Sequence, residues 1–158
     1  MKSKIKQYHP QIIGALLCLV LGILSGYSVK AADSVWYLSL NKPFFNPPPW
    51  IFAPVWTLLY IMMGIALGIL LKDKIKNWRL ILIFVIQFIF NLIWSPIFFY
   101  YQNIGLAFID ISALWVLLVV FMFAARKQRV VFFLFLPYIV WVSFALMLNF
   151  SIYRMNVI

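Results

Sequence analysis

The fold of this chain is decided by residues 46–71, NPPPWIFAPVWTLLYIMMGIALGILL, where a stretch rich in proline and tryptophan leads into a long apolar run. A residue that precedes a proline favours extended or polyproline conformations, so residues 46–48 should form a stiff strap and a helix can begin near Pro49 or Trp50. Pro54 is compatible with this helix because it falls in or beside the first turn, where few backbone N–H groups have intrahelical partners. The stretch therefore predicts a helix with a rigid entrance. The simpler interpretation gives the prolines and tryptophans only the role of a helix start anchored at a membrane interface.

Composition extends this prediction to the whole chain. Of its 158 residues, 66% are hydrophobic and 20% aromatic, whereas about half of a soluble domain is apolar. About 20 apolar helical residues cross the hydrocarbon core of a bilayer, and backbone in lipid must satisfy its own hydrogen bonds. We therefore predict an all-α integral membrane protein, a single domain over residues 1–158 built as a bundle of five transmembrane helices. The predicted spans are about 11–29, 50–71, 80–101, 104–125 and 130–153.

Basic residues are distributed unevenly among the connections. Ten of the 13 Lys and Arg residues lie in the amino-terminal tail and in the second and fourth loops, which face the same side in a five-span topology. The positive-inside rule then predicts a cytoplasmic amino terminus, with residues 30–49 as an outer lid loop. An alternative for the first apolar run is a signal peptide, since three lysines precede it and a small-residue site, VKA, ends at residue 31. The net charge of +10 does not indicate nucleic-acid binding, because the cations form short clusters between apolar runs.

Amide and aromatic side chains within the spans suggest an internal binding site. Gln87 and Asn91 are four residues apart and share one helix face, with Trp94 and Ser95 one turn further. Such polar groups are costly in hydrocarbon and usually face the bundle interior. We expect a pocket with aromatic walls from Trp56, Tyr60, Trp94, Trp141 and Phe144, and with Asn91 and Asp110 as polar partners. Two alternatives stay open at this point: aromatic residues at helical spacing also pack as ordinary core, and Asp110 also suits a structural contact with a neighbouring helix.

Two further patterns concern helix geometry. Pro96 and Pro137 interrupt the third and fifth spans and should kink or bulge them. Proline has no backbone N–H, so the carbonyls of Leu92 and Phe133 lose their usual donors. The pairs Gly22 with Gly26 and Gly64 with Gly68 are GxxxG motifs, which permit close helix contact and make a dimer conceivable. No sequence motif for a metal site, a cofactor or a catalytic nucleophile with its base is present, so neither a metal nor a cofactor is expected.

Four segments together resemble one known family. They are WYLSLNKPFFNPPPWIFAPVWTLLYIMMG at residues 36–64, QFIFNLIWSPIFF at 87–99, GLAFID at 105–110 and PYIVWVSFALMLNFSIYR at 137–154. In this order they resemble the translocator protein family, also called the tryptophan-rich sensory proteins or peripheral benzodiazepine receptors. The resemblance implies a five-helix bundle, often a homodimer, that binds porphyrins such as protoporphyrin and heme-related tetrapyrroles between the helices under the first loop. In animals the family also binds cholesterol and benzodiazepine-type drugs.

The resemblance also implies particular residues. The family's pocket positions correspond to Tyr37, Pro47, Trp56, Tyr60, Asn91, Trp94, Ser95, Trp141 and Ala145. Trp56 and Trp141 match tryptophans that in some bacterial members are linked to light-dependent porphyrin breakdown, so an enzymatic role stays uncertain. The animal cholesterol motif has a central tyrosine where this chain has Phe150, which puts a sterol-like ligand in doubt.

The sequence therefore favours a receptor or transporter for porphyrins and other polycyclic apolar ligands, with a sensory or regulatory role. The expected location, in contact with membrane lipid, is a bacterial inner (cytoplasmic) membrane, because the basic tail is short. The alternatives are a light-dependent porphyrin-degrading protein and a membrane scaffold that needs no ligand.

Overall fold

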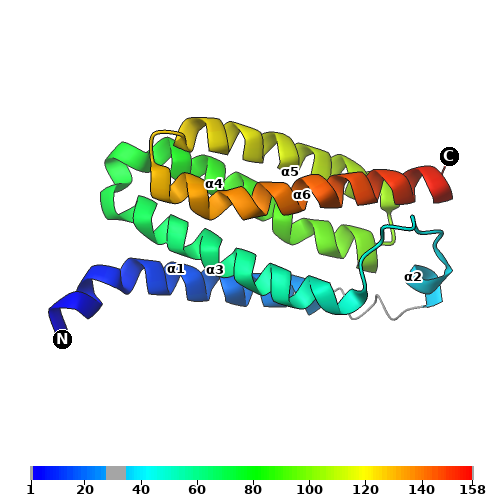
Figure 1. Ribbon diagram of the computed structural model, residues 1–158, viewed down its shortest axis with the longest axis horizontal. Helices are drawn as coiled ribbons and strands as arrows, with labels where there is room; N and C mark the ends of the chain where they lie inside the picture. Colours follow the sequence, from blue (N-terminus) through cyan, green and yellow to red (C-terminus); the bar gives the residue numbers. More distant parts are fainter. Residues whose placement is uncertain (1, 28–34, 158) are drawn as a thin grey trace.

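Five long helices dominate the structure, a computed structural model that describes the backbone of residues 2–27 and 35–157 and the side chains of residues 8–27 and 35–157. The helices run side by side along the long axis of the molecule (Figure 1), and no strand occurs in the described backbone. Four continuous helical stretches are long and apolar enough to cross a membrane, and the one over Pro49–Tyr100 contains two of the long helices. The all-helical architecture is thus confirmed for the described residues, and it is compatible with a membrane bundle. The long helices are α1 (Lys2–Gly26), α3 (Phe52–Leu70), α4 (Lys74–Ser95), α5 (Ile104–Ala125) and α6 (Arg129–Asn156).

The helices do not begin and end where the apolar runs do. α1 begins at Lys2, nine residues before the predicted span, and α4 begins at Lys74 rather than near residue 80. A helix begins where a side chain can replace the missing hydrogen bonds of its first turn. For α4 that residue is Asp73, whose Oδ1 accepts a hydrogen bond from the backbone N–H of Lys76 at 3.2 Å. Residues 28–34, part of the predicted lid loop, lie outside the described residues.

The proline-rich entrance has the predicted form. Pro48 has φ −57° and ψ 142°, which are polyproline angles. A single 3₁₀ turn, η2 (Pro49–Ile51), follows and leads directly into α3. Pro54 lies in the first turn of α3, where its missing N–H removes no helical hydrogen bond. The strap therefore fixes the point and the direction at which the chain enters α3.

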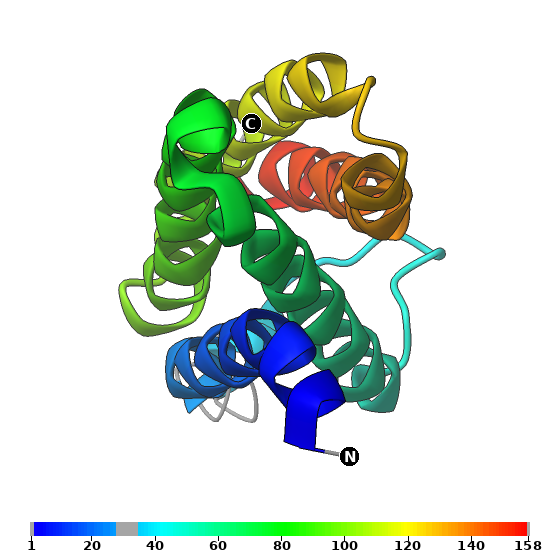
Figure 2. The same ribbon diagram turned by 90° about the vertical axis from the view of Figure 1, so that its left-hand side faces the viewer.

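Helix α3 lies between α1 and α6. Seen along the bundle, α1 lies against one side of α3 while α4 and α5 lie on the other side of the molecule (Figure 2). The most extensive packing is between α1 and α3, followed by α5 with α6, α4 with α5, and α3 with α6. Helices α3 and α4 are consecutive, joined by the 3₁₀ turn η3 (Leu71–Asp73), yet their backbones approach each other less than either approaches its main partner. Side chains bring this pair together, since Tyr60 of α3 contacts the ring of Phe88 of α4.

Glycines explain the close packing of α1 on α3. A Cβ atom at Gly64 would collide with the backbone of Gly14, and one at Gly68 would collide with the backbone of Gln11. A Cβ at Gly22 would enter the ring of Tyr60. The GxxxG motif of α3 thus serves a contact within one chain, where small residues let two backbones approach.

Pro96 produces a local bulge. Residues Pro96–Tyr100 form a π-helical turn, η4, that continues α4. Proline at position 96 cannot donate to the carbonyl of Leu92, and the Ser25 hydroxyl of α1 donates to that oxygen instead, at 2.6 Å. Pro137, by contrast, lies inside a continuous α6, and the kink predicted there stays a prediction.

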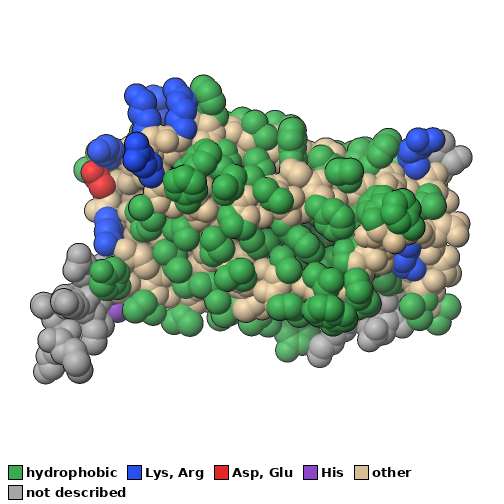
Figure 3. Space-filling view, viewed as in Figure 1, with side chains coloured by type: hydrophobic (Ala, Val, Ile, Leu, Met, Phe, Trp, Pro, Cys, Tyr) green, Lys and Arg blue, Asp and Glu red, His purple; other side chains and the backbone are tan. Residues whose placement is uncertain are grey.

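The two ends of the bundle differ in charge. One end, which we call the basic end, holds the turns between α3 and α4 and between α5 and α6, and Lys and Arg side chains gather there (Figure 3). The other end, the lid end, holds the short helix α2 (Val35–Ser39), the strap and the carboxyl end of α6. The described cations are Lys72, Lys74, Lys76, Arg79, Arg126, Lys127 and Arg129 at the basic end, against Lys42 and Arg154 at the lid end.

The lid end is fastened across the chain. The backbone N–H of Asn41 donates to Oδ1 of Asn156 at 2.9 Å, and Nδ2 of Asn156 donates back to the carbonyl of Asn41 at 2.9 Å. These reciprocal hydrogen bonds join the segment after α2 to the last turn of α6.

Candidate ligand-binding site

Four buried polar side chains form the centre of the site. The Tyr60 hydroxyl of α3 donates to Oδ1 of Asn91 at 2.9 Å, and the Tyr138 hydroxyl of α6 donates to Oε1 of Gln87 at 3.1 Å. All four are buried, and Tyr138 and Gln87 are fully so. Gln87 and Asn91 lie one turn apart on α4, so one face of α4 receives a tyrosine from each of two neighbouring helices.

Aromatic rings extend from this centre toward the lid end. Trp56 stacks on Tyr60 with ring centroids 5.5 Å apart and meets the edge of Tyr138 at 6.3 Å. On α6, Trp141 contacts Phe144 at 5.6 Å and the ring of Phe52 at 6.0 Å. The aromatic side chains predicted on α3 and α6 therefore contact one another, and their role as the walls of a pocket stays a prediction.

A third group of aromatic side chains joins α4 to the lid. Trp94 stacks on Phe98 at 5.3 Å. The Tyr37 ring of α2 meets the edges of Phe98 at 6.3 Å and Phe99 at 5.5 Å. Burial raises the pKa of the Tyr37 hydroxyl, and a hydrogen bond with Asn46 of the strap acts in the opposite direction. The lid thus contributes a half-buried aromatic side chain that contacts the same ring cluster as Trp94.

Several buried polar atoms have no hydrogen-bond partner among the described residues. They are Oδ1 of Asn46, Nε2 of Gln87, Nε1 of Trp94, Oδ2 of Asp110 and Oδ1 of Asn149. Most buried polar groups in proteins are hydrogen-bonded, and an unpaired one needs an explanation. Two of these atoms, Nε2 of Gln87 and Nε1 of Trp94, are donors on residues of the candidate site, so a ligand with acceptor groups could pair with them.

The remaining predicted residues occupy less central positions. Ser95 is buried on α4, Ala145 is half-buried on α6, and Pro47 is half-buried in the strap. Asp110 is buried on α5, and the structure brings no basic side chain within ion-pair distance of it in the described part of the chain. The role of Asp110 as a polar partner for a ligand in the predicted site therefore stays a prediction.

Sequence reasoning noted Gln87 but did not place it in the site, and it missed Tyr138. Tyr138 lies three residues before Trp141, so helical spacing puts both on a similar face of α6. That spacing was the available signal. The spacing does not show, however, that α6 brings Tyr138 to the level of Gln87 on α4.

Two open pockets in the structure lie away from this site. One, of about 550 Å³, is an apolar groove between α1 and α3. The other, of about 500 Å³, lies at the basic end. No predicted ligand-binding residue lines either of them. The aromatic rings of α3 and α6 contact one another directly, so a large ligand would enter by displacing the lid or these rings.

The part of the chain that the structure describes contains no group of three or more His, Cys, Asp or Glu side chains placed to hold a metal ion. Cys18 is buried and free. The site offers flat apolar surfaces and a few hydrogen-bonding atoms.

Comparison with known proteins gives a consistent result. A model of the TspO/MBR family matches residues 14–154. A tryptophan-rich protein TspO from Chlorobaculum tepidum is 41% identical over 144 residues, which cover 89% of this chain and 91% of the relative. A protein of the same name from Archaeoglobus fulgidus is 36% identical, covering 92% and 95% of the two chains. The translocator protein of Ovis aries is 32% identical, covering 85% and 83%.

Proposed function

This chain belongs to the TspO/MBR family, and from that premise we propose that it is a membrane receptor that binds porphyrins and similar flat polycyclic ligands. The ligand would lie between α3, α4 and α6 beneath the lid. Relatives named tryptophan-rich sensory protein and translocator protein support a receptor-like membrane role. The chemistry of the site favours a flat polycyclic ligand, and the resemblance to the translocator protein family narrows this class to porphyrins.

The observation that carries the proposal is the combination of aromatic walls with unpartnered polar atoms. A tetrapyrrole presents two flat apolar faces, which suit stacking on Trp56 and Trp141. It also carries nitrogen atoms and carboxylates, which can pair with a donor such as Nε1 of Trp94. An aliphatic lipid chain would satisfy neither feature. The site therefore favours a rigid aromatic ligand with polar substituents.

Fluorescence titration tests this proposal. Protoporphyrin added to the purified protein should quench tryptophan fluorescence in a saturable manner. The variants Trp56→Phe and Trp141→Phe should each weaken binding about 2- to 10-fold, since one aromatic stacking contact contributes about 0.5–1.5 kcal/mol.

The matched control is Trp78→Phe, because Trp78 is exposed near the beginning of α4, at the opposite end of the bundle. This variant should bind protoporphyrin with wild-type affinity. Equal losses in all three variants, or no saturable quenching in the wild type, would contradict the site.

A further inference from the structure

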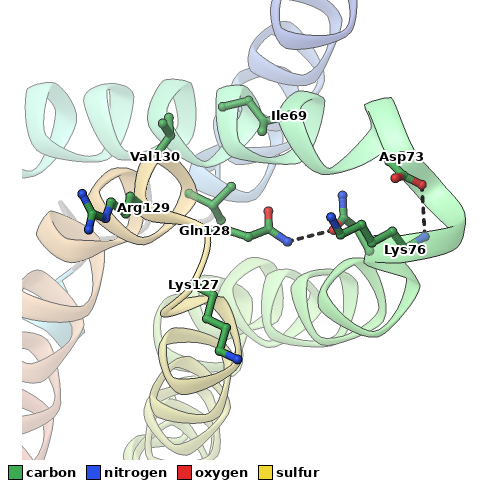
Figure 4. A pocket seen from close by; sticks show the side chains of 9 residues that line it. Ile69, Asp73, Lys76, Lys127, Gln128, Arg129 and Val130 are labelled. Carbon is green, nitrogen blue, oxygen red and sulfur yellow. Dashed lines mark hydrogen bonds between the residues drawn. The ribbon is translucent and has the colours of Figure 1, made fainter.

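The pocket at the basic end takes no part in the proposed function. It has a volume of about 500 Å³ and lies between the turn that joins α3 to α4 and the turn that joins α5 to α6 (Figure 4). The two turns are joined by amide side chains. Nε2 of Gln128 donates to Oδ1 of Asn77 at 2.8 Å, and Nδ2 of Asn77 donates to the carbonyl of Leu70 at 3.0 Å. Asn77 is buried, so these bonds hold the two walls of the pocket at a fixed separation.

The pocket is strongly cationic. Lys76, Lys127 and Arg129 line it, and they outnumber its single carboxylate, Asp73. That carboxylate accepts the backbone N–H of Lys76 as the cap of α4, and its one negative charge leaves the lining with a net positive charge. The cap residue of α6, Gln128, makes no side-chain capping bond, so the positive end of that helix adds to the same field. The pocket therefore favours a negatively charged group.

Apolar side chains complete the lining. Ile69, Val130 and Val131 border the pocket on the side of α3 and α6, and Val130 is largely exposed. The pocket thus lies where the apolar surface of the bundle meets its basic end (Figure 3). A ligand that fits both halves has an anionic head and an apolar body.

We propose that this pocket binds the phosphate headgroup of an anionic membrane lipid, with the upper part of an acyl chain against Ile69 and Val130. Basic pockets between transmembrane helices suit such headgroups, and each nearby Lys or Arg strengthens attraction to anionic lipid about fivefold. A free phosphate ion would use the cations but leave the apolar side of the pocket unused. The geometry therefore favours the lipid over the soluble anion.

Native mass spectrometry of the protein released from nanodiscs containing equal amounts of phosphatidylglycerol and phosphatidylcholine tests the proposal. The wild type should retain phosphatidylglycerol preferentially. Replacing the three lining cations together, as Lys76→Gln, Lys127→Gln and Arg129→Gln, should remove that preference. The matched control replaces three cations of the same end that do not line the pocket, as Lys74→Gln, Arg79→Gln and Arg126→Gln, and should keep it.

Two further measurements make the result decisive. The variant Val130→Glu places a negative charge at the pocket without removing a cation, so it should also lower phosphatidylglycerol retention. Circular dichroism should show wild-type helicity for every variant. Inorganic phosphate at millimolar concentration should not displace the lipid. Equal loss of preference in the pocket variant and the control would show attraction to the whole basic end and overturn the proposal. Absence of any preference in the wild type, or displacement of the lipid by phosphate, would overturn it as well.

Discussion

At the scale of single residues, the centre of the molecule depends on hydrogen bonds between tyrosines and amides. Tyr60 and Asn91 are both buried, and their bond joins α3 to α4, whose backbones otherwise make limited contact. Hydrogen bonds between membrane helices contribute about 0.6 kcal/mol on average and up to about 1.7 kcal/mol. An acceptor left unpaired in a buried site costs somewhat more. The pair therefore serves stability and also sets the position of Asn91 in the candidate site.

We expect Tyr60→Phe to lower the free energy of unfolding by about 0.5–2 kcal/mol, because Oδ1 of Asn91 loses its donor. Thermal unfolding in detergent, followed by circular dichroism, measures the effect. Tyr101→Phe is the control, since Tyr101 is exposed. A Tyr60→Phe midpoint equal to that of the control would show that the bond contributes no stability.

Much of this centre could be predicted from the sequence, and the reason is physical. Gln87 and Asn91 stand out because amides are costly in an apolar helix, which requires them to face inward. The partner of Gln87 could not be found in the same way, because Tyr138 resembles any other aromatic residue in an apolar run. Its role depends on the position of α6 relative to α4, which the packing of both helices against α3 and α5 determines.

At the scale of elements, one helix supplies a hydrogen-bond donor that another helix lacks. The π-helical turn after α4 begins at Pro96, and the Ser25 hydroxyl of α1 supplies the donor that proline lacks. The sequence predicted the bulge at Pro96, but the donor lies 67 residues away from Leu92. Similarly, the GxxxG motif of α3 was recognised, whereas its partner Gly14 belongs to no such motif and was identified only by the packing.

A double-mutant cycle should reveal this dependence. We expect Ser25→Ala to destabilise the protein by about 0.5–1.5 kcal/mol when residue 96 is proline. In a Pro96→Ala background the alanine N–H can bond to the Leu92 carbonyl, so Ser25→Ala should cost little. Unfolding free energies of the four proteins give the coupling. Equal costs of Ser25→Ala in both backgrounds would mean that the serine does not compensate for the proline.

At the scale of the whole molecule, the distribution of charge predicts an orientation. The structure gathers at one end the basic residues of two loops that are separated in sequence by more than 40 residues. The positive-inside rule places this end in the cytoplasm and the lid outside. The sequence alone predicted this grouping, because consecutive spans that are joined by short loops alternate in direction. Which helices become neighbours depends instead on side-chain packing.

Cysteine labelling should establish the orientation. In a Cys18→Ser background, Phe44→Cys at the lid end and Lys127→Cys at the basic end each provide a single thiol; Phe44 is fully exposed and Lys127 is exposed. In intact bacterial cells a membrane-impermeant maleimide should label position 44, and it should label position 127 only after the membrane is opened. The reverse pattern would place the lid in the cytoplasm and contradict the prediction.

The bond between Asn41 and Asn156 has a consequence for the order in which the protein matures. A ribosome delivers residue 41 before α3 to α6 are made, and its hydrogen-bond partner emerges 115 residues later, in the last turn of α6. Until α6 has entered the bilayer, these two hydrogen bonds cannot form. The entrance to the interior is therefore fastened only after α6 is in place, and a variant that lacks the Asn156 side chain would retain its helices but leave that entrance unfastened.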